Sequence, residues 1–319
     1  RMAKESEAGS RSLSGRVGRL VTGIAIAMSL FQLYTGFAGE LPGSKQLSIH
    51  LTFALVLCFL CFPGSKKSPR HRIAILDIIL AILAGASALY LFVNYEHVVT
   101  SVGDAASYDL VIGAVLLILI LEATRRSISP ILPIITIIFL LYAYLGPYCP
   151  DVLAHRGFRV KRIIDHIFMT GEGLWGVPLR VSATFVFLFV LFGAFLERTG
   201  AGEYLINLSF ALMGRFRGGP AKAAVVASCA MGSISGSSIA NTVTTGAMTI
   251  PLMKKVGFQP HVAGAVEVAA STNGQLMPPI MGAAAFIMAE IIGVPYVEIV
   301  KAAFIPAVLS YTAIFSIVH

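Results

Sequence analysis

The sequence predicts an all-α protein that spans a membrane several times and contains a re-entrant hairpin and a discontinuous helix. Three observations predict this fold class. Hydrophobic residues make up 56% of the 319 residues and charged residues only 13%, about half of the roughly 25% found in a soluble domain. Apolar runs close to the ~20 residues that cross a bilayer recur along the chain. Two later segments interrupt such runs with glycines, prolines and small polar residues.

The N-terminal half predicts a polar tail followed by five spans. Residues 1–16 are polar and rich in Ser and Arg, which predicts a disordered tail. Apolar runs follow at 20–38, 48–63, 73–95, 108–121 and 130–145. Cys58 and Cys61 lie inside the second apolar run. We therefore expect their side chains to pack against other apolar groups rather than to form a redox or zinc site. Asp77 and Glu122 lie at the ends of spans, and we expect them to be anchors at the level of the lipid headgroups.

Basic residues occur in alternate loops. They lie in the tail, after the second span and after the fourth span: Lys4, Arg11, Arg16, Arg19, Lys66, Lys67, Arg70, Arg72, Arg125 and Arg126. The loop after the third span has Glu96 and Asp104 but no Lys or Arg. Because Lys and Arg collect on the cytoplasmic side of membrane proteins, the N-terminus is predicted to be cytoplasmic. The net charge of +8 therefore reflects topology rather than a surface for nucleic acid.

Residues 150–175 do not continue this pattern. Between His155 and His166, seven ionisable side chains alternate with aliphatic and aromatic ones, which predicts an amphipathic helix at the membrane interface. This basic segment falls on the outer side, against the positive-inside rule. A span at 182–197 and a second interfacial helix at 203–216 follow.

Residues 219–255 predict a re-entrant hairpin. Two apolar stretches, 221–231 and 243–253, flank the polar sequence GSISGSSIANT at 232–242. Half-length helices of about 12 residues reach about 18 Å. Arg215 and Arg217 before the unit, and Lys254 and Lys255 after it, place both of its ends in the cytoplasm. The polar tip is therefore predicted near the bilayer midplane, where irregular backbone occurs only around a polar cavity.

Residues 261–293 predict a discontinuous helix. The sequence STNGQLMPP at 271–279 separates two apolar halves, and its prolines and glycine must interrupt the helix. In secondary transporters such breaks build a midplane site, in which helix N-termini face anions and unwound oxygens hold a cation such as Na⁺. Glu267 lies within the first half and is a functional candidate, unless it pairs with Lys254 near the cytoplasmic end. A last span is predicted at 299–318.

The sequences GSISGSSIANT and STNGQLMPPIMGAAAFIMAE resemble the large membrane subunit of tripartite ATP-independent periplasmic (TRAP) transporters. The wider chain resembles fused permeases that join the small and large subunits. After the disordered cytoplasmic tail at 1–16, the resemblance implies a four-helix small-subunit-like region at 17–127, a linking helix at 128–150, and the first inverted repeat of the large subunit at 151–319. It also implies that the second repeat would follow beyond His319.

The resemblance implies an elevator-type, Na⁺-coupled importer in the bacterial inner membrane. Its substrates would be small organic acids, such as dicarboxylates or amino acids, that a periplasmic binding protein delivers. Na⁺ is the coupling ion, and no cofactor or other metal is expected. The residues that match the family's ion-binding loop and the facing unwound stretch are Ser235, Ser237, Ser238, Asn241, Thr242, Thr272, Asn273 and Gly274. The residues assigned to the substrate pathway are Glu267, Gln275, Pro278 and Pro279.

Several alternatives compete with this interpretation. Small residues in membrane helices also serve close packing, which would explain the glycines without a site. An intramembrane serine protease would need an activated nucleophile with a base, but the sequence has no GxSxG motif and no His in a neighbouring span, so no enzyme is expected. An ion channel also uses re-entrant loops, although the broken helix favours a carrier. A Na⁺-coupled carboxylate carrier that needs no binding protein remains the main alternative.

Overall fold

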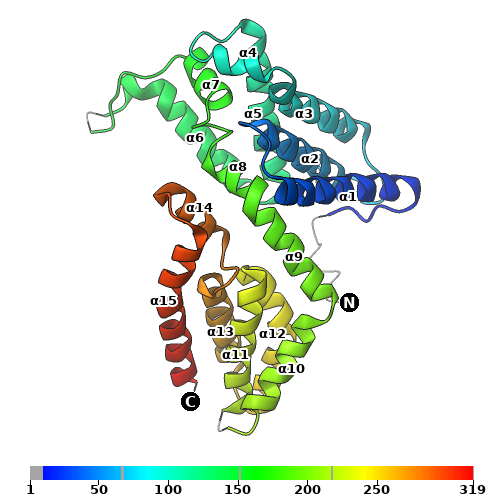
Figure 1. Cartoon of the computed structure of the whole chain (residues 1–319), viewed down its shortest axis with the longest axis vertical. Coiled ribbons are helices and arrows are strands. Elements are labelled where there is room, and N and C mark those ends of the chain that lie inside the picture. The colour runs from blue at the N-terminus through cyan, green and yellow to red at the C-terminus, as the bar shows by residue number, and fades with distance from the viewer. Residues whose placement is uncertain (1–9, 66–67, 151, 217, 319) are drawn as a thin grey trace. The chain divides into compact units, whose positions relative to one another are not determined.

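The computed structural model describes residues 10–318 except 66–67, 151 and 217. All regular elements in this described part are helices, which confirms the all-α prediction (Figure 1). Six of the described helices are long and apolar enough to cross a membrane. They are α1 (Gly15–Ala38), α3 (Ile75–Val93), α5 (Ser107–Ser127), α6 with the 3₁₀ turn that follows it (Ile131–Tyr148), α8 to α9 (Val177–Arg198) and α15 (Tyr296–Ile317). Each coincides with a predicted span.

Two further apolar helices are shorter. The helix α2 (Lys45–Cys61) matches the predicted second span, and α14 (Ala283–Ile292) is the second half of the predicted discontinuous helix. The chain divides into two compact units, Arg1–Thr184 and Phe185–His319. The finer domain division expected from the sequence, with boundaries at residues 16, 127 and 150, stays a prediction.

The core of the first unit lies between α2, α3 and α5. Ala84 and Ala88 of α3 are fully buried and allow the close helix approach that small residues give. The amphipathic helix predicted within 150–175 is α7 (Val160–Met169), which contacts α5. Its end is anchored in the core by Phe168 and by Trp175, whose indole N–H donates to the carbonyl of Phe168 at 2.6 Å. The basic side chains of α7, by contrast, are exposed.

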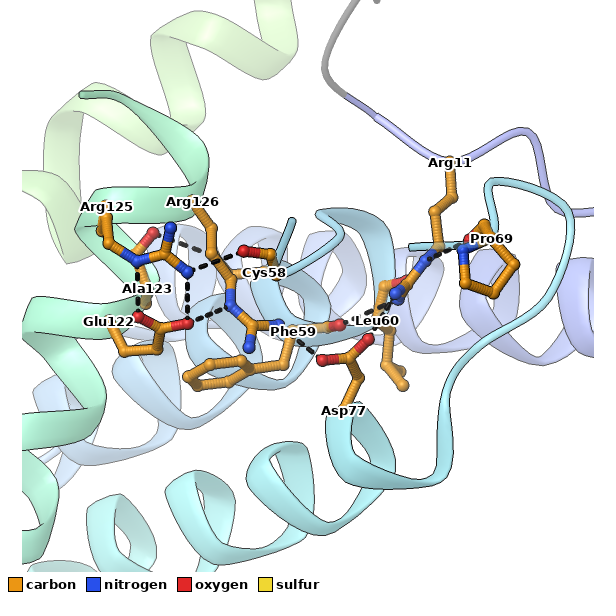
Figure 2. A network of polar contacts seen from close by, with 11 residues as sticks. Arg11, Cys58, Phe59, Leu60, Pro69, Asp77, Glu122, Ala123, Arg125 and Arg126 are labelled. Carbon is orange, nitrogen blue, oxygen red and sulfur yellow. Dashed lines mark hydrogen bonds and ion pairs between the residues drawn. The ribbon is translucent and has the colours of Figure 1, made fainter. Parts of the chain in front are cut away.

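One end of the first unit is tied together by a buried network of charged groups (Figure 2). Asp77 accepts hydrogen bonds from both Arg11 and Arg126, and these three side chains are at most 4% exposed. Arg126 also pairs with Glu122 at 2.6 Å. The prediction that Asp77 is a headgroup-level anchor is therefore wrong. Its carboxylate is buried because two guanidinium groups converge on it, as buried charges require.

The predicted tail contributes to this network. Arg11 donates to the carbonyls of Phe59 and Leu60 at the C-terminal end of α2, at 3.3 and 3.1 Å. A cation there complements the negative end of the helix dipole. The structure thus folds this part of the tail against the bundle, while residues 1–9, with Lys4, lie outside the described residues. Lys66, Lys67 and Arg217 of the charge pattern lie outside them as well.

The second unit is built around α11 (Gly219–Ser235). This helix contacts α10 (Ala201–Met213), α12 (Ser238–Lys255) and α13 (Pro260–Asn273), and α15 lies against α13 (Figure 1). The buried residues of α11 include many small ones, which let these helices approach closely: Ala221, Ala223, Ala224, Ala227 and Ser228. The predicted 203–216 helix is α10.

The predicted hairpin is α11 and α12, but its helices are longer than expected. They contain 17 and 18 residues instead of about 12, and only Gly236 and Ser237 lie outside them. The polar residues assigned to the tip are accommodated inside the helices, because hydroxyls such as that of Ser233 donate to a carbonyl of their own helix as Ser and Thr side chains can. The predicted break is confirmed: α13 ends at Asn273, a 3₁₀ turn covers Gly274–Leu276, and α14 begins at Ala283.

Candidate functional site

The tip of the hairpin brings two oppositely polarised helix ends together. Gly236 ends α11 in the left-handed conformation, with φ +59°, which glycine adopts without a steric penalty. Ser237 caps α12, because its hydroxyl accepts a hydrogen bond from the backbone N–H of Ala240 at 3.3 Å. The carbonyl end of one helix and the N–H end of the next are therefore separated by two residues. Such ends carry partial negative and positive charge, respectively.

The break in the discontinuous helix lies directly against this tip. The backbone N–H of Ile280 donates to the carbonyl of Ser233 at 3.3 Å. The side-chain amide of Gln275 donates to the hydroxyl of Ser238 at 2.7 Å. The structure thus brings together the two segments that the sequence predicts to face each other.

Two glycines make the approach possible. A Cβ atom on Gly232 would lie 2.4 Å from the Cα of Gly274, far inside any van der Waals contact. A Cβ on Gly236 would lie 1.8 Å from the carbonyl oxygen of Met281. In each case the obstacle is backbone, which cannot rotate away. The hairpin and the break are therefore in backbone contact, and only glycine fits at this contact.

Asn241 lies beside this contact and is fully buried. Its Nδ2 donates to the carbonyl of Ser228 at 2.8 Å, and a Cβ on Gly274 would lie 3.0 Å from the same nitrogen. Its Oδ1 is buried and has no hydrogen-bond partner among the described residues. An unsatisfied buried acceptor costs about 1–3 kcal/mol, and such a group marks a place where water or an ion can bind.

The other predicted ion-site residues make different contacts. The hydroxyls of Thr242 and Thr272 donate to carbonyls of their own helices. The amide of Asn273 donates to the hydroxyl of Ser310 on α15 at 2.6 Å. Ser235 and Ser237 border a cavity of about 350 Å³ that Asn241 also lines. Pro278 and Pro279 lie in the non-helical stretch between the two half-helices.

The cavity lies within the second unit, where the hairpin meets α9 (Phe187–Arg198) and α10. Its walls are mostly apolar and include Met231 and Ile234. The polar groups on its border come from the tip, from Thr244 of α12 and from Glu197 at the end of α9. A mostly apolar cavity with a few placed polar groups is typical of small-molecule sites.

Glu267 lies at a second polar cluster, deep between the hairpin and α13. It is fully buried and forms no ion pair within the described ranges, while Lys254 is exposed. The alternative of a Glu267–Lys254 pair is therefore wrong. Four hydroxyls that the sequence does not predict as site residues surround the carboxyl group instead: Ser228, Thr245, Thr249 and Ser271. A signal was present, because Thr245 and Thr249, like Glu267 and Ser271, are spaced four residues apart on one helix face.

A comparison with known protein families and solved structures relates this architecture to one family. The family model described as "Tripartite ATP-independent periplasmic transporter, DctM component" matches residues 115–319. No solved structure matches the chain.

Curated relatives align with a shorter segment. The chain is 36% identical over 91 residues to protein YgiK of Salmonella typhimurium, which covers 28% of this chain and 21% of that protein. It is 38% identical over 91 residues to the C4-dicarboxylate TRAP transporter large permease protein DctM of Vibrio cholerae, covering 28% and 20%. It is 32% identical over 91 residues to the isethionate TRAP transporter permease protein DctMQ of Oleidesulfovibrio alaskensis, covering 28% and 14%. The aligned segment thus spans about a fifth of the length of the first two relatives.

The family match covers well over half of the chain and includes the hairpin, the break and the residues between them. With its six long apolar helices, the chain is a multi-pass membrane protein that belongs to the DctM family of tripartite ATP-independent periplasmic transporter components.

Proposed function

We propose that this chain is the permease part of a Na⁺-coupled secondary importer of small organic acids. The observation that carries the proposal is the buried, unpartnered Oδ1 of Asn241 at the backbone contact between the hairpin and the discontinuous helix. A transporter of this kind needs a site where an ion bound between two segments changes how they separate. The contact of Gly232 with Gly274 is such a place.

The oxygen atoms around Asn241 are of the kinds that bind Na⁺. They are neutral oxygens from the amide of Asn241, from the carbonyl of Ser228 that Asn241 contacts, and from the hydroxyls of Ser235 and Ser237 on the same cavity, which are the kinds of ligand that hard cations prefer. We assign Asn241 and Gly274 to the site, together with the tip serines Ser235, Ser237 and Ser238. Thr242, Thr272 and Asn273 remain predicted members, whose side chains would have to exchange their present hydrogen bonds.

An organic anion suits the N-terminal end of α12, at the cavity that Asn241 also lines. The N-terminal end of α12 carries partial positive charge and lies at the cavity bordered by Ser237. The names of two relatives refer to C4-dicarboxylates and isethionate, which are both organic anions. We therefore assign the substrate pathway to this region, with Gln275, Pro278 and Pro279 of the break beside it.

The proposal also covers the membrane in which the importer lies and the protein that delivers its substrate. The importer lies in the bacterial inner membrane with a cytoplasmic N-terminus, and a periplasmic binding protein delivers its substrate. Residues 17–127 then serve as a small-subunit-like region fused ahead of the permease. Support comes from the positive-inside pattern and from membership of a periplasmic transporter family.

The variant Asn241→Ala tests the ion site. In proteoliposomes that contain the whole transporter and its binding protein, the concentration of Na⁺ that gives half-maximal uptake should rise about tenfold, which corresponds to about 1.4 kcal/mol of lost ion binding. The matched control is Asn207→Ala on the exposed side of α10, which should leave this concentration unchanged.

Unchanged Na⁺ dependence in Asn241→Ala, with normal expression, would exclude the assigned ion site. A current that rises linearly with voltage and does not require Na⁺ would instead indicate a channel. Uptake that needs no binding protein would indicate the carboxylate carrier named above.

A further inference from the structure

Two residues of the hairpin hold Asn241 in place. The Nδ2 of Asn241 donates to the main-chain carbonyl of Ser228 on α11 at 2.8 Å. The hydroxyl of Thr245, one turn later on α12, lies 2.7 Å from the main-chain carbonyl of Asn241 itself. All three residues are fully buried. The position of Asn241 therefore depends on where Ser228 and Thr245 are held.

The carboxyl group of Glu267 contacts both of these residues. The hydroxyl of Ser228 donates to its Oε1 at 2.8 Å, and the hydroxyl of Thr245 also donates to Oε1. Because a hydroxyl has only one hydrogen, Thr245 shares it between Glu267 and the carbonyl of Asn241. Ser271, on the same helix as Glu267, donates to Oε1 at 2.9 Å. The two contacts that position Asn241 thus lead to one oxygen atom of Glu267.

The contact with Ser228 determines how the amide of Asn241 is oriented. A main-chain carbonyl only accepts hydrogen bonds, so the amide nitrogen faces Ser228 and the amide oxygen is left without a partner among the described residues. If Ser228 moved, the amide could turn over and present its N–H groups where a cation needs an oxygen ligand. A cation site at Asn241 therefore requires that Ser228 stay in place.

The location of Glu267 suits it to hold these residues. Its side chain is fully buried and lies near the middle of α13, seven residues after Pro260. The helix α12 packs closely on it, because a Cβ atom on Gly246 would lie 3.1 Å from the Cγ of Glu267. A buried acceptor that loses its donors is costly, so the carboxyl group keeps the surrounding hydroxyls in fixed directions.

We propose that Glu267 is a positioning residue for the cation site at Asn241. Through Ser228 and Thr245 it keeps the amide oxygen of Asn241 available to Na⁺, and it acts through these residues rather than by touching the ion. The inference rests on the Na⁺ site proposed above. It gives Glu267 a role in the ion site, whereas the sequence assigns this residue to the substrate pathway.

The variants Thr245→Val and Thr249→Val form a matched pair that tests this role. Both hydroxyls are fully buried on α12, and both contact Glu267 and the carbonyl four residues earlier. Only the hydroxyl of Thr245 reaches Asn241. Both variants should therefore lower the unfolding temperature by similar amounts. In proteoliposomes with the whole transporter and its binding protein, the Na⁺ concentration for half-maximal uptake should rise about fivefold in Thr245→Val and at most about twofold in Thr249→Val.

Equal rises in this concentration for the two threonine variants would overturn the proposal. Such a result would mean that the hydroxyls around Glu267 serve only stability. The maximal rate of uptake gives a further check, because a defect confined to the ion site should disappear at saturating Na⁺.

The variants Glu267→Gln and Glu267→Ala separate the hydrogen bonds from the charge. Both remove the carboxylate, but the amide oxygen of glutamine can still accept from Ser228 and Thr245. The Na⁺ concentration for half-maximal uptake should therefore rise about fivefold more in Glu267→Ala than in Glu267→Gln. An equal rise in both variants would overturn the proposal, because the ion site would then need the charge of Glu267 rather than its hydrogen bonds. The threonine pair decides the question if Glu267→Ala does not fold.

A double variant shows whether these contacts act through Asn241. When Asn241→Ala is combined with Thr245→Val, half-maximal uptake should need no more Na⁺ than in Asn241→Ala alone, because no amide remains to be positioned. Effects that multiply would overturn the proposal. Failure of the Na⁺ site itself is distinguishable, since Asn241→Ala alone would then leave the Na⁺ dependence unchanged, and this inference would fall with the site.

Discussion

Gly232→Ala is expected to destabilise the second unit by about 1–3 kcal/mol, the usual range for overpacking a filled interior. The added methyl group would lie 2.4 Å from the Cα of Gly274. Since the obstacle is the backbone of the facing segment, the hairpin and the break must move apart to accommodate it. Thermal unfolding of the purified chain in detergent, followed by tryptophan-independent means such as circular dichroism, measures the loss.

A matched substitution separates this clash from the general effect of removing glycine from a helix. Gly264 lies within α13, and a Cβ there would meet nothing within 4 Å. Gly264→Ala should therefore stabilise the chain by about 0.5–1 kcal/mol, the usual gain when alanine replaces glycine in a helix. The two alanine variants should thus shift the unfolding temperature in opposite directions. Shifts of the same sign would mean that the backbone contact between Gly232 and Gly274 does not limit packing.

The membrane spans and the break could be predicted from the sequence because each depends on a local requirement. A span needs a run of apolar residues, since the bilayer leaves no partner for exposed backbone groups. A break needs residues that cannot continue a helix, and Pro278 and Pro279 have no backbone N–H to donate. The turn at Gly236 also depends on a local requirement, because the left-handed conformation at a helix end favours glycine.

The polar contacts could not be predicted because they join residues that are distant in sequence. Arg11 and Asp77 are 66 residues apart, and Ser228 and Glu267 are 39 apart. Composition shows that a buried carboxylate needs partners, but many hydroxyls or bases in the chain could serve. The lengths of α11 and α12 were underestimated for a related reason. Glycine and serine are poor helix formers, yet packing against α13 and the break keeps them helical.

Asp77→Ala is expected to destabilise the first unit by about 3–5 kcal/mol, as removal of one partner from a buried ion pair does. Asp77 accepts from Arg11 and Arg126, whose side chains are 0% and 4% exposed. Without this carboxylate, Arg126 keeps Glu122 as an acidic partner in the network of Figure 2, whereas the buried guanidinium group of Arg11 keeps no acidic partner in that network. The loss should appear as a lower unfolding temperature and a smaller folded fraction at equal denaturant concentration. The exposed pair of Glu298 and Lys301 gives the control, and Glu298→Ala should cost less than about 1 kcal/mol.

A double-mutant cycle identifies what Arg11 contributes. Arg11 pairs with Asp77, but it also donates to the carbonyls of Phe59 and Leu60 at the end of α2. If the ion pair dominates, the double variant of Arg11→Ala and Asp77→Ala should lose about 0.5–3 kcal/mol less than the sum of the single variants, as coupled neighbours do. Additive losses would instead mean that Arg11 acts mainly as a cap on α2. In that case Arg126 alone would balance the charge of Asp77, and the segment before α1 would be held by backbone carbonyls rather than by charge.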